Sequence, residues 1–182
     1  MKGEIFVEFI NLVEDQFGLA TADAILSDPE LPSGGSYSRV ATYSHEEMVR
    51  LVLSLSSETG VDAISLQMVF GRFLFGRLLN AHPTFVAPYA GCFELLHAIH
   101  GVIHTQVRTL YPDADLPKII VTDESAESLL LNYTSERGLG HVCHGLIEGC
   151  IEHFNEPIQV ERLDLANEAL VFNASFRLTR LN

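Results

Sequence analysis

Three side chains that can hold anions stand at two-residue spacing in the second half of the chain. Tyr133, Ser135 and Arg137 occupy positions i, i+2 and i+4, and an extended segment would place all three on one face. Two hydroxyl groups and a guanidinium fork suit a pair of anions held side by side. Histidine is the commonest side-chain ligand of metals. This trio together with one histidine, His104, suggests a dianionic metal cofactor, and heme with its two propionates fits.

A helix expected over residues 90–110 carries three candidate ligands. His97, His100 and His104 stand at i, i+3 and i+7, which predicts a shared helix face. Glu94 is the only nearby acid and the pattern H-E-x-x-H is absent, so a zinc or di-iron site lacks partners. An apolar helix face with one neutral imidazole suits the proximal side of heme. The spacing does not choose among the three histidines. Each could also be an ordinary helix residue, and the tyrosine–serine–arginine trio could be a surface strand with an ion pair.

A second group of cysteines and histidines lies within one later segment. Its members are His141, Cys143, His144, Cys150 and His153. A zinc site with two or three of these ligands is conceivable, but a closed four-ligand site needs more partners than one helix face offers. We therefore expect Cys143 and Cys150 to be buried free thiols.

Composition narrows the class of protein. The chain has 182 residues, of which 47% are hydrophobic and 19% charged, enough for the core of a single domain over 1–182. A net charge of −13 argues against a nucleic-acid partner, because phosphate binding needs clustered lysine and arginine. Three cysteines, no secretory signal pattern and no long apolar run predict a soluble, cytoplasmic protein without a membrane partner.

Hydrophobic periodicity predicts helices first and strands later. Helices are expected over 2–18, 21–28, 44–60, 63–79, 90–110 and 139–154, with a loop over 29–42. Ser44 and Glu47 read as a capping box, and Asp62 as the cap of the following helix. Strands are expected near 119–121, 129–133, 158–164 and 168–178. The order indicates an α+β fold, with a helical lobe over about 1–60 and a lobe over about 61–182 with a four-stranded antiparallel sheet.

Several short motifs, taken in order, are shared with a known family. They are Met1-Lys2-Gly3-Glu4-Ile5-Phe6, Ile103-His104-Thr105-Gln106-Val107, Tyr111-Pro112, Leu116-Pro117, Tyr133-Thr134-Ser135-Glu136-Arg137 and Gly145-Leu146-Ile147-Glu148-Gly149. Over essentially the whole length the chain resembles the heme-nitric oxide/oxygen-binding (H-NOX) family. That family includes bacterial gas sensors and the heme domain of soluble guanylate cyclase. The resemblance implies a heme b buried between the two lobes, with His104 as the axial ligand and Pro117 packed on the porphyrin. It also implies that Tyr133, Ser135 and Arg137 bind the propionates.

The same resemblance implies the distal wall of the pocket. Its residues would be Phe9, Leu74, Val142 and Leu146. Oxygen-binding relatives have a tyrosine where this chain has Val142, and tend to have tryptophan and asparagine at the positions of Phe9 and Leu74. Bound O₂ gains stability from a hydrogen-bond donor, whereas NO bonds strongly to ferrous iron without one. An apolar wall here would therefore select NO over O₂.

The sequence thus predicts a standalone heme-based nitric oxide sensor, able to bind CO as well and without catalytic activity of its own. By the resemblance, its signal would pass to a sensor histidine kinase or a diguanylate cyclase. Two alternatives remain open from the residues. One is a metal-dependent enzyme that uses the helix of His97, His100 and His104. The other is an oxygen or redox sensor of the same fold.

Overall fold

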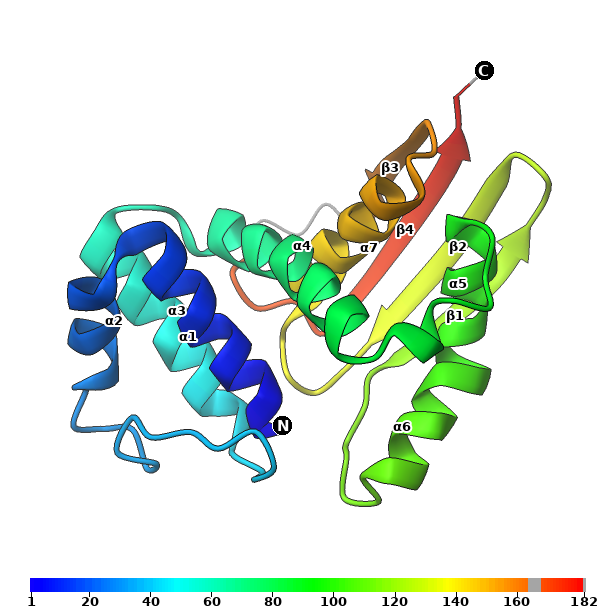
Figure 1. Cartoon of the computed structure of the whole chain (residues 1–182). Coiled ribbons are helices and arrows are strands. Elements are labelled where there is room, and N and C mark those ends of the chain that lie inside the picture. The colour runs from blue at the N-terminus through cyan, green and yellow to red at the C-terminus, as the bar shows by residue number, and fades with distance from the viewer. Residues whose placement is uncertain (164–167, 182) are drawn as a thin grey trace.

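The computed structural model describes residues 1–163 and 168–181. Its helical elements are α1 (Gly3–Phe17), α2 (Leu19–Leu26), α3 (His45–Thr59), α4 (Ala63–Ala81), the 3₁₀ turn η1 (Pro83–Phe85), α5 (Cys92–Ala98), the π-helical turn η2 (Ile99–Ile103), α6 (His104–Leu110) and α7 (Gly140–Phe154). The strands are β1 (Lys118–Glu124), β2 (Ser128–Thr134), β3 (Ile158–Arg162) and β4 (Asn173–Arg180). Helices α1 to α3 form one group and the sheet forms the other, with α4 running between them (Figure 1).

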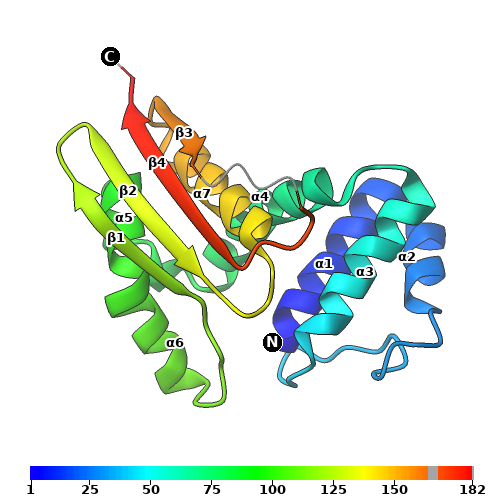
Figure 2. The ribbon, with the colours of Figure 1, turned by 180° about the vertical axis from the view of Figure 1, so that it is seen from behind.

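The sheet confirms the predicted α+β fold. The strand order is β1-β2-β4-β3, and every neighbouring pair is antiparallel. Helices α5 and α7 cover one face of the sheet, and Figure 2 shows the strands from the other face. The buried side chains of β2 are Leu129, Leu131 and Tyr133, which alternate along the strand as a half-buried sheet requires.

The start of the last strand differs from the prediction. β4 begins at Asn173, so the strand expected from residue 168 was wrong for its first residues. Their backbone groups pair with another segment instead: Val171 forms an isolated parallel bridge with Leu139, and the Phe172 carbonyl accepts a hydrogen bond from Ser135 N–H at 2.9 Å. The end of the strand predicted over 158–164 lies partly outside the described residues.

Two helix starts show where the local sequence decides the structure. Asp62 caps α4 as predicted, because its carboxylate accepts a backbone hydrogen bond from the first turn at 3.0 Å. Ser44 also caps α3, but its hydroxyl accepts from Glu46 N–H at 3.2 Å. The predicted capping box with Glu47 was wrong. Instead, the Glu47 carboxylate accepts a hydrogen bond at 3.0 Å from the hydroxyl of Tyr37, which lies in the loop between α2 and α3. This partner lies away from the N-terminus of α3, so the carboxylate does not cap the helix.

Two hydrophobic clusters hold the molecule together. The first joins α1 to α3 with α4, and its fully buried members include Phe6, Phe9, Met48, Leu51 and Phe70. The second lies between the sheet and helices α5 and α7. α4 follows residue 60 in the chain, yet it contributes to the first cluster. The division into two lobes near residue 60 therefore stays a prediction. Within the described residues no helix is both long and apolar enough to cross a membrane.

Glycines let α4 and α7 approach each other closely. A Cβ on Gly71 would meet the Val142 carbonyl and come within 2.8 Å of the Gly145 Cα. A Cβ on Gly145 would meet the Met68 carbonyl, so neither position has room for a side chain. The backbones of the two helices are therefore in direct contact along this line.

Candidate cofactor site

A cavity of about 330 Å³ lies where the two groups of elements meet. This volume is within the range of small-molecule and cofactor sites. The beginning of α1, helices α4 to α7 and strands β1 and β2 all contribute to its wall. Most of the lining is apolar: Ile5, Leu74, Phe75, Leu78, Leu79, Phe85, Val86, Leu95, Leu96, Ile99, Ile103, Val107, Leu116, Pro117, Ile119, Leu131, Leu139, Val142, Leu146 and Ile147.

His104 is the candidate metal ligand that faces this cavity. Its Nδ1 atom is buried and makes no hydrogen bond to any residue that the structure describes. Burial, and then the nearby His100 and Arg108, lower the pKa of His104 to about 4, against a weaker opposite effect of the Pro117 backbone. The imidazole is therefore neutral at pH 7, the form in which histidine binds metals.

The three histidines of this helical segment do not share one environment. His97 is mostly exposed and its Nδ1 lies 2.7 Å from a Glu124 carboxylate oxygen on β1. His100 and His104 have ring centroids 6.4 Å apart, and His100 does not line the cavity. The predicted common face was wrong because the π-helical turn η2 puts an extra residue into one turn and rotates His104 relative to His97. Among the described residues, no group of three or more side chains is arranged to hold a metal ion.

Tyr133, Ser135 and Arg137 come together at the cavity, but not along one strand. β2 ends at Thr134, so Ser135 and Arg137 lie beyond the strand. The chain turns after the strand, and Arg137 N–H donates to the Ser135 hydroxyl oxygen at 3.2 Å. This turn brings all three side chains to the lining of the same cavity.

The guanidinium of Arg137, at the edge of the cavity (its rim) formed with Tyr133 and Ser135, is mostly covered. The Arg137 side chain is only 11% exposed, and its Nη2 donates to an Asp115 carboxylate oxygen at 2.9 Å. Burial first, only partly offset by a hydrogen bond with Ser135, raises the pKa of Tyr133 to about 12, so its hydroxyl stays protonated and can donate. A guanidinium and two hydroxyl groups at one edge of an apolar cavity are a site for a carboxylate-bearing ligand.

The predicted distal residues divide into two sets. Leu74, Val142 and Leu146 line the cavity, as does Pro117. Phe9 does not: it is fully buried in the first cluster and meets Phe70 edge-to-face, with ring centroids 5.1 Å apart.

The polar lining residues missed by the sequence reasoning include His82, Tyr111 and Asp115. The His82 ring stacks on Phe85, and its Nε2 lies 3.5 Å from a Glu4 carboxylate oxygen. These residues lie beside prolines in connecting segments, where no helical or strand period identifies a buried face.

The cysteine and histidine group around α7 is dispersed by the fold. Cys143 lines the cavity, while the Cys150 thiol donates to the Cys92 sulfur at 3.3 Å. The His153 ring contacts the Phe75 and Phe154 rings. All three cysteines are buried and free, as was predicted for Cys143 and Cys150.

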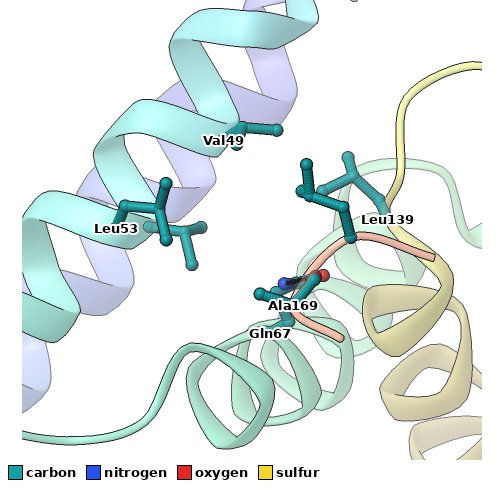
Figure 3. A pocket seen from close by; sticks show the side chains of 7 residues that line it. Val49, Leu53, Gln67, Leu139 and Ala169 are labelled. Atoms are coloured by element: carbon teal, nitrogen blue, oxygen red, sulfur yellow. Dashed lines mark hydrogen bonds between the residues drawn. The ribbon is translucent and has the colours of Figure 1, made fainter. Parts of the chain in front are cut away.

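A second cavity is too small for an organic ligand. It holds about 10 Å³, close to the space of one water molecule. Val49 and Leu53 of α3 face it from one side and Leu139 from the other, and the Gln67 amide donates to the Ala169 carbonyl at 2.7 Å (Figure 3). This cavity marks a loosely packed point in the contact of α3 with the sheet half of the molecule.

Comparisons with known proteins place this fold and cavity in one family. A model of the haem-NO-binding family matches residues 2–162. The solved structure of an Fe(II) unliganded H-NOX protein from K. algicida is 35% identical, with a TM-score of 0.92, and the match covers 100% of this chain and 97% of that one. An H-NOX from Shewanella woodyi in the Fe(II)CO state is 34% identical, with a TM-score of 0.82 and coverage of 100% and 95%. An H-NOX protein from S. oneidensis in the Fe(II)NO state is 26% identical, with a TM-score of 0.88 and full coverage of both chains.

The fold and the cavity define a heme-binding sensor domain. The chain belongs to the H-NOX family, as its family match and its similarity to the K. algicida and S. woodyi proteins show. A search of curated proteins gave no significant match.

Proposed function

We propose that this protein is a heme-based nitric oxide sensor with His104 as the axial ligand of heme b. The observation that carries the proposal is the neutral imidazole of His104, with its buried Nδ1, at an apolar cavity whose rim carries the mostly covered guanidinium of Arg137. Heme needs these two features together, a nitrogen ligand for iron and a counter-charge for its propionates. When bound, the heme supplies the ferrous iron that binds the gas.

The residues of the chain divide the work of holding this cofactor. His104 offers an unprotonated nitrogen, and burial keeps water and protons from competing for it. Tyr133 and Ser135 offer hydroxyl groups and Arg137 a guanidinium, which together match the two propionates. Pro117 lies in the cavity wall, where a rigid ring can press on a flat ligand. Asp115 holds the Arg137 side chain toward the same rim.

The apolar part of the cavity wall supports selectivity for NO. Leu74, Val142 and Leu146 cannot donate a hydrogen bond to a bound diatomic gas. O₂ needs such a donor more than NO or CO does, so the wall favours NO and CO. The Fe(II)NO state of the S. oneidensis protein and the Fe(II)CO state of the S. woodyi protein support these ligands. Phe9 would act from behind the wall by filling space beside Phe70.

The sensor would act through a partner rather than by catalysis. The cavity is lined by both the start of α1 and the sheet half of the chain, so a change in its contents alters the contact between them. This arrangement can bias a two-state equilibrium when a ligand fits one state better. We propose a cytoplasmic sensor histidine kinase or diguanylate cyclase as the partner.

An optical titration of the ferrous protein tests the proposal. The purified protein should show the visible bands of heme, shift on addition of NO and of CO, and form no stable oxygen complex in air. A stable oxygen complex would contradict NO selectivity, and a protein without heme bands after reconstitution would contradict the cofactor. Catalytic turnover at a metal bound by His100 and His104 would favour the enzyme alternative.

A further inference from the structure

Two buried cysteines from distant parts of the chain lie sulfur to sulfur. Cys92 is the first residue of α5 and Cys150 lies in the last third of α7. The Cys150 thiol donates to the Cys92 sulfur, with the two Sγ atoms 3.3 Å apart. Their exposed fractions are 0% and 1%. A contact of this kind aligns the two atoms that a disulfide would join.

We propose that Cys92 and Cys150 form a redox-active pair that hydrogen peroxide converts to a disulfide. Peroxide first oxidises one thiol to a sulfenic acid and is itself reduced to water. The second thiol then attacks the sulfenic sulfur and the S–S bond forms. The sulfenic hydroxyl group leaves with the proton of the second thiol as a second water. Two thiols and one peroxide thus give one disulfide and two waters. Because a disulfide needs about 2 Å between its sulfurs, the pair must close by roughly 1 Å.

The surroundings of the pair set its rate and its selectivity. Cys150 also lines the large cavity, so a small oxidant that enters beside the cofactor can reach its sulfur. The hydrogen bond with Cys92, and then burial, raise the pKa of the Cys150 thiol, which keeps it protonated and slows its oxidation. We therefore expect the pair to react more slowly than free glutathione. A sulfenic acid formed there meets its neighbour before further oxidation.

The proposed bond would tie together two walls of the cavity. α5 leads through η2 to His104, and α7 carries Val142 and Leu146. A disulfide would fix the beginning of this helical segment against α7, and a dithiol reductant would release it. The pair is thus a redox input into the sensor that is separate from gas binding, and its formation does not depend on the proposed NO selectivity.

Thiol counting and peptide mapping on the full-length, heme-loaded protein test the proposal. After peroxide treatment the chain is unfolded in an alkylating agent. Two of the three thiols should escape alkylation, the intact mass measured before alkylation should fall by two hydrogen atoms, and a peptide pair joined through Cys92 and Cys150 should appear. C143A is the matched control, since it removes the third buried thiol, which also lines the cavity, and it should still lose two thiols.

Three results would overturn the proposal, and the wild-type peptide map alone can give each of them. These are a disulfide that includes Cys143, oxygen added to single cysteines without a crosslink, and three intact thiols under conditions that oxidise the unfolded chain. C92A adds a further check if it folds, because it should form no intramolecular disulfide.

Discussion

Glu8 and His104 both have buried polar side-chain atoms, and the fold treats them in opposite ways. The Glu8 carboxylate, 5% exposed, accepts hydrogen bonds from Arg77 and Arg39 at 2.5 Å and from Asn11 at 3.0 Å. His104 lies in the other half of the molecule with an unpaired buried nitrogen. A buried carboxylate with all its partners within the chain holds the fold together. An unpaired imidazole nitrogen points to a ligand where its residue also lines a cavity: the Nδ1 atoms of His100 and His104 are both unpaired among the described residues, but only His104 of these two lines the cavity.

The largest expected effect, on heme binding, comes from removing the imidazole of His104. His104→Gly should lose much of its heme, because only the rim and the apolar packing remain to hold it. Free imidazole should restore binding and the visible spectrum by taking the place of the side chain. His82→Ala is the matched control, since it removes the other histidine of the same cavity, and it should keep a wild-type spectrum. Full heme occupancy of His104→Gly without imidazole would refute the assignment of His104.

Removing the charge of Glu8 should lower the stability of the fold and leave heme binding unchanged. Glu8→Gln keeps the shape but removes the charge, and we expect a loss of about 2 kcal/mol of unfolding free energy, less than for a fully buried pair because both arginines are nearly half exposed. Urea titrations of both proteins measure it. Glu14→Gln, on the exposed face of α1, should be close to neutral.

The pH dependence of this loss sharpens the comparison. Burial alone would raise the pKa of Glu8, but the hydrogen bonds from Arg77, Asn11 and Arg39 outweigh it and lower the pKa below its usual 4.5. Glu8 therefore stabilises the fold above about pH 4.5, and this contribution disappears as the pH falls through the lowered pKa. The difference between wild type and Glu8→Gln should shrink in acid. A difference that grows in acid would contradict the ion-pair account.

Arg137→Ala tests whether the rim cation serves the ligand or only Asp115. A charged hydrogen bond contributes roughly 1.5–3 kcal/mol, so heme retention should fall about tenfold or more. Heme transfer to apo-myoglobin measures the rate. Lys118→Ala removes an exposed charge outside the cavity and should leave that rate unchanged. Equal rates for wild type and Arg137→Ala would make Arg137 a surface ion-pair residue.

The smallest effect is expected at the apolar wall. Val142→Tyr adds a hydroxyl where oxygen-binding relatives have one, and a neutral hydrogen bond is worth roughly 0.5–1.5 kcal/mol, so O₂ affinity should rise by about tenfold at most. Val142→Phe supplies the same ring without the hydroxyl and should show no gain in an O₂ titration. A gain in both variants would assign the change to shape rather than to hydrogen bonding.

Local patterns in the sequence were sufficient for much of the fold. Asp62 and Gly60 fix the connection between α3 and α4 through a side-chain cap and a left-handed backbone, which are effects of neighbouring residues. The π-helical turn η2 could not be predicted, because an apolar face stays apolar when one residue is added to a turn. The exposed Phe172 continued the alternation of β4, and only its hydrogen bond with Ser135 shows that it lies before the strand.

Lining residues of the cavity were named from the sequence where the family motifs lie, and were missed where contacts are long-range. His104, Arg137 and Val142 are in shared motifs or at positions fixed relative to them. His82 reaches the cavity because α4 ends beside it, and the pairing of Cys92 with Cys150 depends on the packing of α5 against α7. No spacing in the sequence encodes either relation.

The glycine contact between α4 and α7 has a consequence for redesign. A Cβ on Gly149 would lie 2.8 Å from the Phe75 Cβ, so this helix pair is spaced by missing side chains along its length. Leu74 and Leu146, on the same two helices, face the cavity instead. Their replacement can change the chemistry of the pocket while the backbone spacing stays set by the glycines. The side chains that line this part of the cavity can therefore be redesigned independently of the helix backbones that carry them.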